Sequence, residues 1–128
     1  MKVKTALILC AGFGKRVQPI TDSLPKPLIN YKDETLLENT IKFLIKLKIS
    51  KIKINVFYLK EKIISFIENK NFPLNIEIVD DGETILGTGG GILSLINKSD
   101  EEDVLVINPD TIWDDSFISS VIDMENIY

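Results

Sequence analysis

The stretch TALILCAGFGKR, from Thr5 to Arg16, decides the fold of this 128-residue sequence. Its first half is an almost wholly apolar run that ends at Cys10, which is typical of a strand buried on both faces of a parallel sheet. Its second half places Gly12 and Gly14 beside two cations, so that backbone N–H groups can approach an anion closely. The stretch therefore predicts a central strand that ends at a candidate phosphate-binding loop.

Further strands and helices are expected to alternate along the rest of the chain. Strands are predicted over residues 52–59, 74–78 and 104–107, each apolar or alternating. Helices are predicted from about Thr35, where Thr35 and Glu38 match a capping box, over 61–69, after the glycines of 87–91, and after Asp114 and Asp115. This alternation predicts an α/β fold, a Rossmann-like three-layer α/β/α arrangement around a mostly parallel sheet.

The expected strand order points to one ligand-binding edge. Right-handed crossovers predict the order 3-2-1-4, which reverses between the first and fourth strands. Ligands of such sheets bind at the carboxyl ends of the strands at that reversal. The Gly12 loop and Asp110 both follow strands there. The fourth strand is apolar throughout, as a central strand should be, yet its far edge is predicted to be uncovered in this chain.

Composition excludes several kinds of chemistry. Because the chain has no histidine, it cannot form a Ser-His or Cys-His pair or a His-bearing metal site. Its one cysteine excludes an internal disulfide and fits a reducing cytoplasm. The net charge of -4 argues against non-specific nucleic-acid binding, and no apolar run approaches the roughly 20 residues that span a bilayer. We expect a cytoplasmic domain with neither a nucleic-acid nor a membrane partner.

Charge is distributed unevenly along the chain. Residues 1–62 hold thirteen Lys or Arg against five acids, whereas residues 63–128 hold two against fourteen. The simpler interpretation is two differently solvated surfaces. The functional interpretation is that phosphate-binding cations lie early in the chain and metal-binding acids lie late.

Two familiar phosphate loops fit residues 9–17 poorly. A P-loop requires Gly, four residues, then Gly-Lys and Ser or Thr, whereas Leu9 and Arg16 occupy the first and last of these positions. A dinucleotide fingerprint requires a third small residue where Val17 stands, and an acid at the end of the second strand. A tight turn with two solvated cations is the structural alternative.

A longer ordered pattern fits better. Ala11-Gly12-Phe13-Gly14-Lys15-Arg16, Pro19-Ile20-Thr21 and Pro25-Lys26-Pro27-Leu28 follow one another within eighteen residues. The pattern closely resembles the start of the sugar-1-phosphate nucleotidyltransferase family, whose signature reads Gly-x-Gly-x-Arg, Pro-Leu-Thr and Pro-Lys-Pro. The resemblance implies that Arg16 and Lys26 are catalytic, Arg16 at the departing β- and γ-phosphates and Lys26 at the α-phosphate. It also implies that the nucleotide is bound by Ala11, Gly12, Gly14 and Lys15.

Two later motifs resemble the same family. The run Leu86-Gly87-Thr88-Gly89-Gly90-Gly91 resembles its second glycine element, so that Gly87, Thr88 and Gly89 would contact the base and ribose; a turn before a helix is the alternative. Asn108-Pro109-Asp110 resembles the family's Asn-Gly-Asp, with Pro109 in the glycine position. Asp110 would then ligate Mg²⁺, the cofactor that the resemblance implies, because Mg²⁺ prefers carboxylate and phosphate oxygens. An aspartate in an ordinary turn after a strand is the alternative.

The resemblance covers the chain but only the amino-terminal part of the family domain. We therefore expect residues 1–128 to be a single, incomplete nucleotidyltransferase domain, its nucleotide-binding half. The implied partners are a nucleoside triphosphate, UTP or GTP, and a sugar 1-phosphate. Thr88, followed by three glycines, and Trp113, soon after Asp110, resemble the pattern of the family branch that acts on N-acetylmuramate 1-phosphate or mannose 1-phosphate. Two functions stay open: Mg²⁺-dependent nucleotidyl transfer within a fuller assembly, or nucleotide binding without catalysis. The uncovered strand edge is the expected site of self-association or of pairing with a second fragment.

Overall fold

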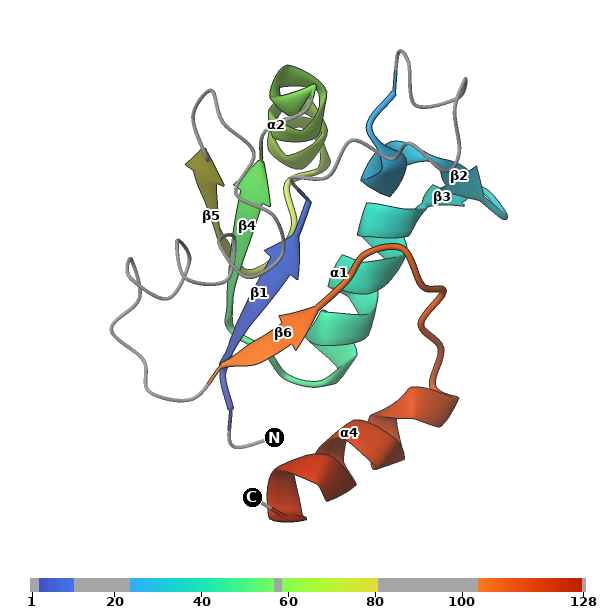
Figure 1. The fold of residues 1–128 in the computed structure, drawn as a ribbon, viewed down its shortest axis with the longest axis vertical. Coiled ribbons are helices and arrows are strands. Elements are labelled where there is room, and N and C mark those ends of the chain that lie inside the picture. The colour runs from blue at the N-terminus through green and yellow to red at the C-terminus, as the bar shows by residue number, and fades with distance from the viewer. Residues whose placement is uncertain (1–2, 11–23, 57–58, 81–103, 128) are drawn as a thin grey trace.

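A computed structural model of the chain describes residues 3–10, 24–56, 59–80 and 104–127. Four strands in these ranges form one parallel sheet in the order β5-β4-β1-β6 (Figure 1). They are β1 (Thr5–Leu9), β4 (Lys51–Val56), β5 (Asn75–Asp80) and β6 (Leu105–Ile107). Counted along the predicted strands, this is the order 3-2-1-4, so the predicted parallel α/β fold and its strand order are confirmed.

The helices of the described part pack on one face of the sheet. They are α1 (Leu36–Lys46), α2 (Lys60–Lys70) and α4 (Ser116–Ile127). One apolar cluster joins them to the sheet: Ala6, Ile8, Ile52, Ile54, Val56 and Ile107 from the strands, Leu37, Ile41, Phe43 and Leu44 from α1, Ile63 and Ile67 from α2, and Phe117, Ile118 and Val121 from α4. The helix expected after residues 87–91 lies outside the described residues. None of the described helices is long and apolar enough to cross a membrane.

The first helix begins where its sequence predicts. Thr35 is the N-cap of α1, and its hydroxyl accepts a hydrogen bond from the Glu38 N–H at 3.0 Å. The Glu38 carboxylate forms ion pairs with Lys70 of α2 at 2.9 Å and with Lys42 at 3.3 Å. Glu38 therefore ties the first turn of α1 to the end of α2.

Glu38→Gln is expected to flatten the acid side of the stability profile. Hydrogen bonds from Lys70 and Lys42 hold the pKa of Glu38 below its usual value. Because the folded-state pKa is the lower one, this stabilisation is complete above the unfolded-state value of about 4.3 and is lost as pH falls through the folded-state pKa. In urea unfolding, the wild-type midpoint should exceed that of Glu38→Gln at about pH 6, and the gap should shrink at about pH 3.

The comparison needs a matched control. Glu61→Gln, an exposed change in the first turn of α2, removes the same charge from another site, and the gap to wild type should change more with pH for Glu38→Gln than for Glu61→Gln. A gap between wild type and Glu38→Gln that does not change between the two pH values would contradict the assignment.

A short hairpin precedes α1, in a stretch for which no strand was predicted. β2 (Asn30–Tyr31) and β3 (Glu34–Thr35) pair antiparallel around Lys32 and Asp33, whose φ angles are 48° and 70°. Two consecutive positive φ angles are typical of a type I′ turn, for which Asn-Gly is the usual sequence signal. The hairpin was not predicted because Lys-Asp adopts this turn without that signal.

The last strand lies at the edge of the described sheet. Among the described strands, β6 pairs with β1 alone. Its central residue, Val106, is 40% exposed. The unbroken apolar run predicted that both faces of this strand are covered. The exposure of Val106 shows that this prediction is not met in the described part of the chain. Among the described strands, β6 is the last in the sheet on this side.

Candidate active site

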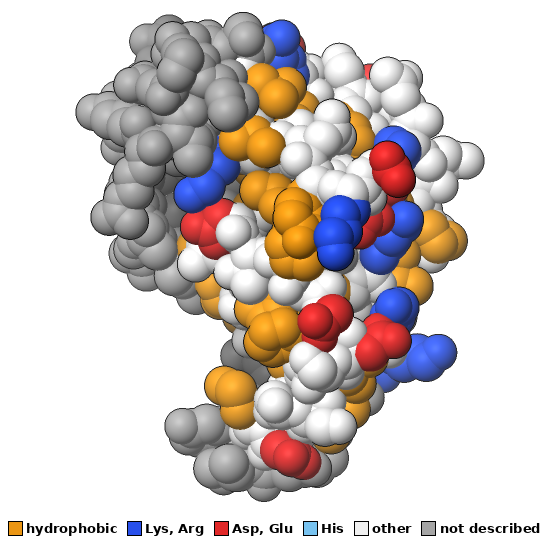
Figure 2. Space-filling model, turned by 90° about the vertical axis from the view of Figure 1, so that its right-hand side faces the viewer, with side chains coloured by type: hydrophobic (Ala, Val, Ile, Leu, Met, Phe, Trp, Pro, Cys, Tyr) orange, Lys and Arg blue, Asp and Glu red, His pale blue; other side chains and the backbone are white. Residues whose placement is uncertain are grey.

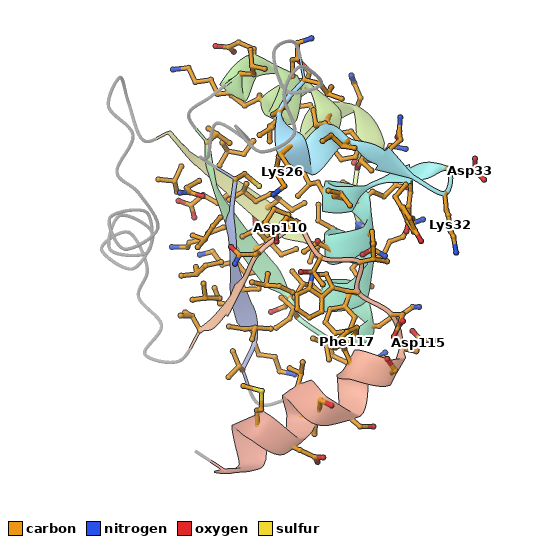
Figure 3. All side chains as sticks on the ribbon, turned by 45° about the vertical axis from the view of Figure 1, so that its right-hand side comes forward. Lys26, Lys32, Asp33, Asp110, Asp115 and Phe117 are labelled. Carbon is orange, nitrogen blue, oxygen red and sulfur yellow. The ribbon has the colours of Figure 1, made fainter. Side chains whose placement is uncertain are left out.

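Two of the predicted site residues come together at the carboxyl end of the sheet. Lys26 lies in the 3-10 turn η3 (Lys26–Leu28), and Asp110 lies in the turn after β6. Their Nζ and Oδ2 atoms are 3.4 Å apart, although 84 positions separate the residues in sequence. Figure 3 shows the two side chains facing one another between η3 and the end of β6. Because the side chains are 32% and 45% exposed, a ligand can reach both charges.

The backbone around Lys26 is fixed by its neighbours. Pro25 and Pro27 are both buried, and Pro25 precedes the turn with φ −65° and ψ 145°. The Leu28 N–H donates to the Pro25 carbonyl at 2.9 Å, and the Ile29 N–H donates to the Lys26 carbonyl at 3.1 Å. Proline restricts φ and removes alternative conformations. Lys26 thus presents its charge from a turn whose backbone is restricted by a proline on each side.

Asp110 lies in a turn that packs against helices on the sheet face. The neighbouring Pro109 is buried, and the Trp113 indole N–H donates to the Asn108 carbonyl at 3.2 Å, which closes the turn around Asp110. The Trp113 ring stacks on Phe43 of α1, with centroids 5.3 Å apart, and meets Phe117 of α4 edge-on at 5.1 Å. The carboxylate is therefore carried by a turn with an aromatic anchor.

The end of β1 is held by a residue that the sequence did not single out. Asn55 of β4 lies opposite Leu9 in the sheet, and its buried Oδ1 accepts the Cys10 N–H at 2.8 Å. This bond fixes the chain direction at the last described residue before the glycine loop. The available signal was an asparagine between Ile54 and Val56, near the end of β4. Cys10 is buried and packs as a small hydrophobe, and burial raises the pKa of its thiol, which disfavours the thiolate that a nucleophile requires.

Folding intermixes the charges that the sequence separates. Late acids pair with early lysines: Asp115 with Lys46 at 2.7 Å, and Glu77 with Lys53 at 3.8 Å. Figure 2 shows acidic and basic side chains close together on the side of the molecule that lies to the right in Figure 1. These ion pairs bring together opposite charges that lie far apart in the sequence. The Ser116 hydroxyl and N–H both donate to the Asp114 carboxylate and hold its pKa below the usual value. The bond from the Ser116 N–H also caps the start of α4.

The other predicted site residues lie outside the described residues. These are Ala11, Gly12, Gly14, Lys15 and Arg16 of the first glycine loop, and Gly87, Thr88 and Gly89 of the second. Within the described ranges, no group of three or more His, Cys, Asp or Glu side chains could hold a metal ion. Asp110 therefore offers a single carboxylate, beside a lysine, to any cation in this part of the site.

Comparison with known proteins places most of the chain in one family. The family model described as "Nucleotidyl transferase" matches residues 5–126. The bifunctional protein GlmU of Methanococcus maripaludis is 40% identical over 94% of this chain and 28% of its own length. The N-acetylmuramate alpha-1-phosphate uridylyltransferase of Caulobacter vibrioides is 31% identical over 86% of this chain and 47% of its own.

A solved structure shows the same fold. The UTP-bound UGPase from Acinetobacter baumannii superposes with a TM-score of 0.78 at 21% identity, over 98% of this chain and 53% of that one. At this identity the match supports the fold alone. The chain thus spans from about a quarter to about half of the length of the proteins that it matches.

Proposed function

This chain belongs to the nucleotidyl transferase family, and from that premise we propose that it binds a nucleoside triphosphate and serves nucleotidyl transfer to a sugar 1-phosphate. In this reaction an oxygen of the sugar phosphate forms a bond to the α-phosphorus. The bond from that phosphorus to the bridging oxygen breaks, and pyrophosphate leaves with the electron pair. The products are a nucleoside diphosphate sugar and pyrophosphate.

The observation that carries the proposal is the pairing of Lys26 with Asp110. An ammonium group carried by a turn of restricted backbone lies next to a carboxylate, and both are accessible, so that together they can bind the two charges of a metal–phosphate complex. We propose that Lys26 stabilises the charge on the α-phosphate oxygens during transfer. Arg16 would hold the departing phosphates, because a guanidinium group can bind them in bidentate fashion. The chain then accelerates transfer by alignment and charge neutralisation, without a covalent intermediate.

Magnesium is part of the proposal, and the residues present fit it. Mg²⁺ is commonly held by one or two protein carboxylates together with substrate phosphates, rather than by an all-protein cage. Asp110, a single partly exposed carboxylate after β6, matches that ligand set. When bound, Mg²⁺ would neutralise phosphate charge and help to orient the triphosphate. Asp110 would hold it, and the first glycine loop, with Lys15, would supply backbone donors to the same phosphates.

We propose UTP or GTP as the nucleotide, bound at its base and ribose by Gly87, Thr88 and Gly89. The uridylyltransferase of Caulobacter vibrioides makes UTP the first donor to test. The acceptor would be a sugar 1-phosphate such as N-acetylmuramate 1-phosphate or mannose 1-phosphate. The proposal places the protein in the cytoplasm, without a nucleic-acid or membrane partner; cell fractionation that finds it elsewhere would contradict this.

A second candidate function is nucleotide binding without transfer by this chain alone. The residues of this chain correspond to 47% and 53% of the uridylyltransferase and UGPase chains, and within the described ranges Asp110 offers a single carboxylate to a metal. The sugar site and further metal ligands would then come from more chain, paired along the exposed edge of β6, either from a second fragment or from a second copy.

Pyrophosphate release separates the two functions. The purified chain, with Mg²⁺, UTP or GTP, and each sugar 1-phosphate, is expected to bind nucleotide but to release little pyrophosphate. Sedimentation at the same concentrations reports association. Rapid release by monomeric chain would show that the chain is a sufficient enzyme and would overturn the second candidate. Absence of nucleotide binding under every condition would overturn both.

A further inference from the structure

We propose that Asn39 is a positioning residue that fixes the Asp110 turn through Trp113. Asn39 lies in the first turn of α1, and its side chain contacts the backbone of Trp113, 74 positions later in the sequence. The inference deepens the proposed function, on which its consequence for metal and nucleotide binding rests. The geometric part, that Asn39 fixes the turn, does not depend on that function.

The Asn39 side chain forms both hydrogen bonds that the Trp113 backbone can offer. Asn39 Nδ2 donates to the Trp113 carbonyl at 3.0 Å, and the Trp113 N–H donates to Asn39 Oδ1 at 2.7 Å. Because the Trp113 N–H and carbonyl belong to the two peptide groups on either side of its Cα, this two-point contact fixes the orientation of the Trp113 backbone as well as its distance from α1. The residue is half-buried, where an unmade backbone hydrogen bond is costly. Trp113 is thus attached to α1 through its backbone and, by stacking on Phe43, through its ring.

A third contact determines which way the amide points. Asn39 Nδ2 also donates to Glu34 Oε1 at 3.2 Å, and the other oxygen of that carboxylate accepts from Lys42 at 2.9 Å. A flipped amide would turn its oxygen toward the Glu34 carboxylate and the Trp113 carbonyl, both of which are acceptors. The site therefore requires an amide. Aspartate has nearly the same shape but could keep only the bond from the Trp113 N–H, and it would add a negative charge beside Glu34.

Trp113 determines the position of Asp110 because it closes the short turn in which Asp110 lies. The Trp113 indole N–H donates to the Asn108 carbonyl at 3.2 Å, so one residue contacts both α1 and the start of the turn. Asp110 lies between these two points. A change in the attachment of Trp113 would thus change the position from which the carboxylate meets Lys26.

The same helix end also holds Lys26. The Leu36 N–H, at the start of α1, donates to the Ile29 carbonyl at 3.0 Å, directly after η3. The neighbouring Leu28 of η3 is buried in the core cluster to which α1 contributes. Both charges of the candidate site are therefore positioned relative to the first turn of α1, the cation by main chain and packing and the carboxylate by Asn39.

The geometric part is tested without metal or nucleotide, using the full chain. Trp113 is the only tryptophan, so its indole N–H gives a single signal in a ¹H–¹⁵N spectrum. Asn39→Ala and Asn39→Asp should each raise its solvent-exchange rate by about tenfold or more, because the turn loses its attachment. Lys46→Ala is the matched control. It removes the exposed contact from α1 to Asp115, just beyond the turn, and should leave the rate within about twofold.

The consequence for the site is tested with Mn²⁺ as the metal probe and UTP or GTP as the nucleotide. Asn39→Ala and Asn39→Asp should weaken Mn²⁺ binding to the chain–nucleotide complex by about tenfold, with unchanged far-UV dichroism, and Lys46→Ala should not. Unchanged indole exchange in both Asn39 variants would overturn the inference, as would altered exchange with wild-type Mn²⁺ affinity. If the wild-type chain binds no nucleotide with Mn²⁺, the proposed function fails, and the exchange experiment still decides whether Asn39 fixes the turn.

Discussion

Asp110→Asn is expected to remove most of the effect of Mg²⁺ on nucleotide binding. Loss of a residue that only supports a metal ligand commonly costs about 10–100-fold in metal affinity, so loss of the ligand itself should cost at least as much. The same change should have the opposite sign without metal. Removing a carboxylate that pairs with Lys26 at 3.4 Å frees the lysine and removes a charge that repels phosphate, so metal-free binding should be unchanged or tighter.

Calorimetric titration of UTP and GTP, with Mg²⁺ and with EDTA, measures both effects. Asp115→Asn is the matched control, since Asp115 is an exposed carboxylate of the same segment that pairs with Lys46 instead. It should behave as wild type in both titrations. If Asp110→Asn and Asp115→Asn weaken binding equally, general charge rather than metal ligation is responsible, and the assignment of Asp110 is wrong.

Lys26→Gln is expected to weaken nucleotide binding whether or not Mg²⁺ is present. A charge-assisted hydrogen bond to phosphate is worth about 1.5–3 kcal/mol, which corresponds to a loss of about tenfold or more. In an assembly that supports transfer, the loss in kcat should be larger, about 10²–10³-fold, because Lys26 would act on charge that develops in the transition state. This pattern differs from that of Asp110→Asn, which is harmful only with metal.

The control for Lys26 is Lys32→Gln. Lys32 is an exposed lysine at the tip of the β2–β3 hairpin, away from the Lys26–Asp110 pair in Figure 3, with its Nζ 5.4 Å from the ring centroid of Tyr31. The Lys32 variant changes the net charge by the same amount and should bind nucleotide within about twofold of wild type. An equal loss in the two variants would assign the effect to net charge and remove the specific role of Lys26.

The sheet could be predicted from sequence because each of its strands carries a strong local signal. The apolar run that ends at Cys10 and the alternation of residues 74–78 reflect burial on two faces or one. Chain geometry then permits few strand orders. The N-cap at Thr35 was equally local, since a hydroxyl and the N–H three residues later suffice to form it.

What could not be predicted depends on contacts between distant residues or on unusual backbone angles. Nothing in residues 36–40 indicates that Asn39 contacts Trp113, because that contact exists only after β6 has paired with β1. The hairpin at Lys32 and Asp33 was missed because its turn lacks glycine. The Lys26–Asp110 contact lies between these cases: the motifs marked both residues, topology predicted a shared edge, and only the structure gave the 3.4 Å approach.

A structure of the chain with Mg²⁺ and a non-hydrolysable UTP or GTP analogue tests the central claim most directly. We predict the metal on the Asp110 carboxylate and the Lys26 ammonium turned from Asp110 to the phosphates. The nucleotide should lie across the carboxyl ends of β1 and β6. A nucleotide bound elsewhere, or one bound there while the Lys26–Asp110 pair stays closed and contacts neither metal nor phosphate, would contradict the account.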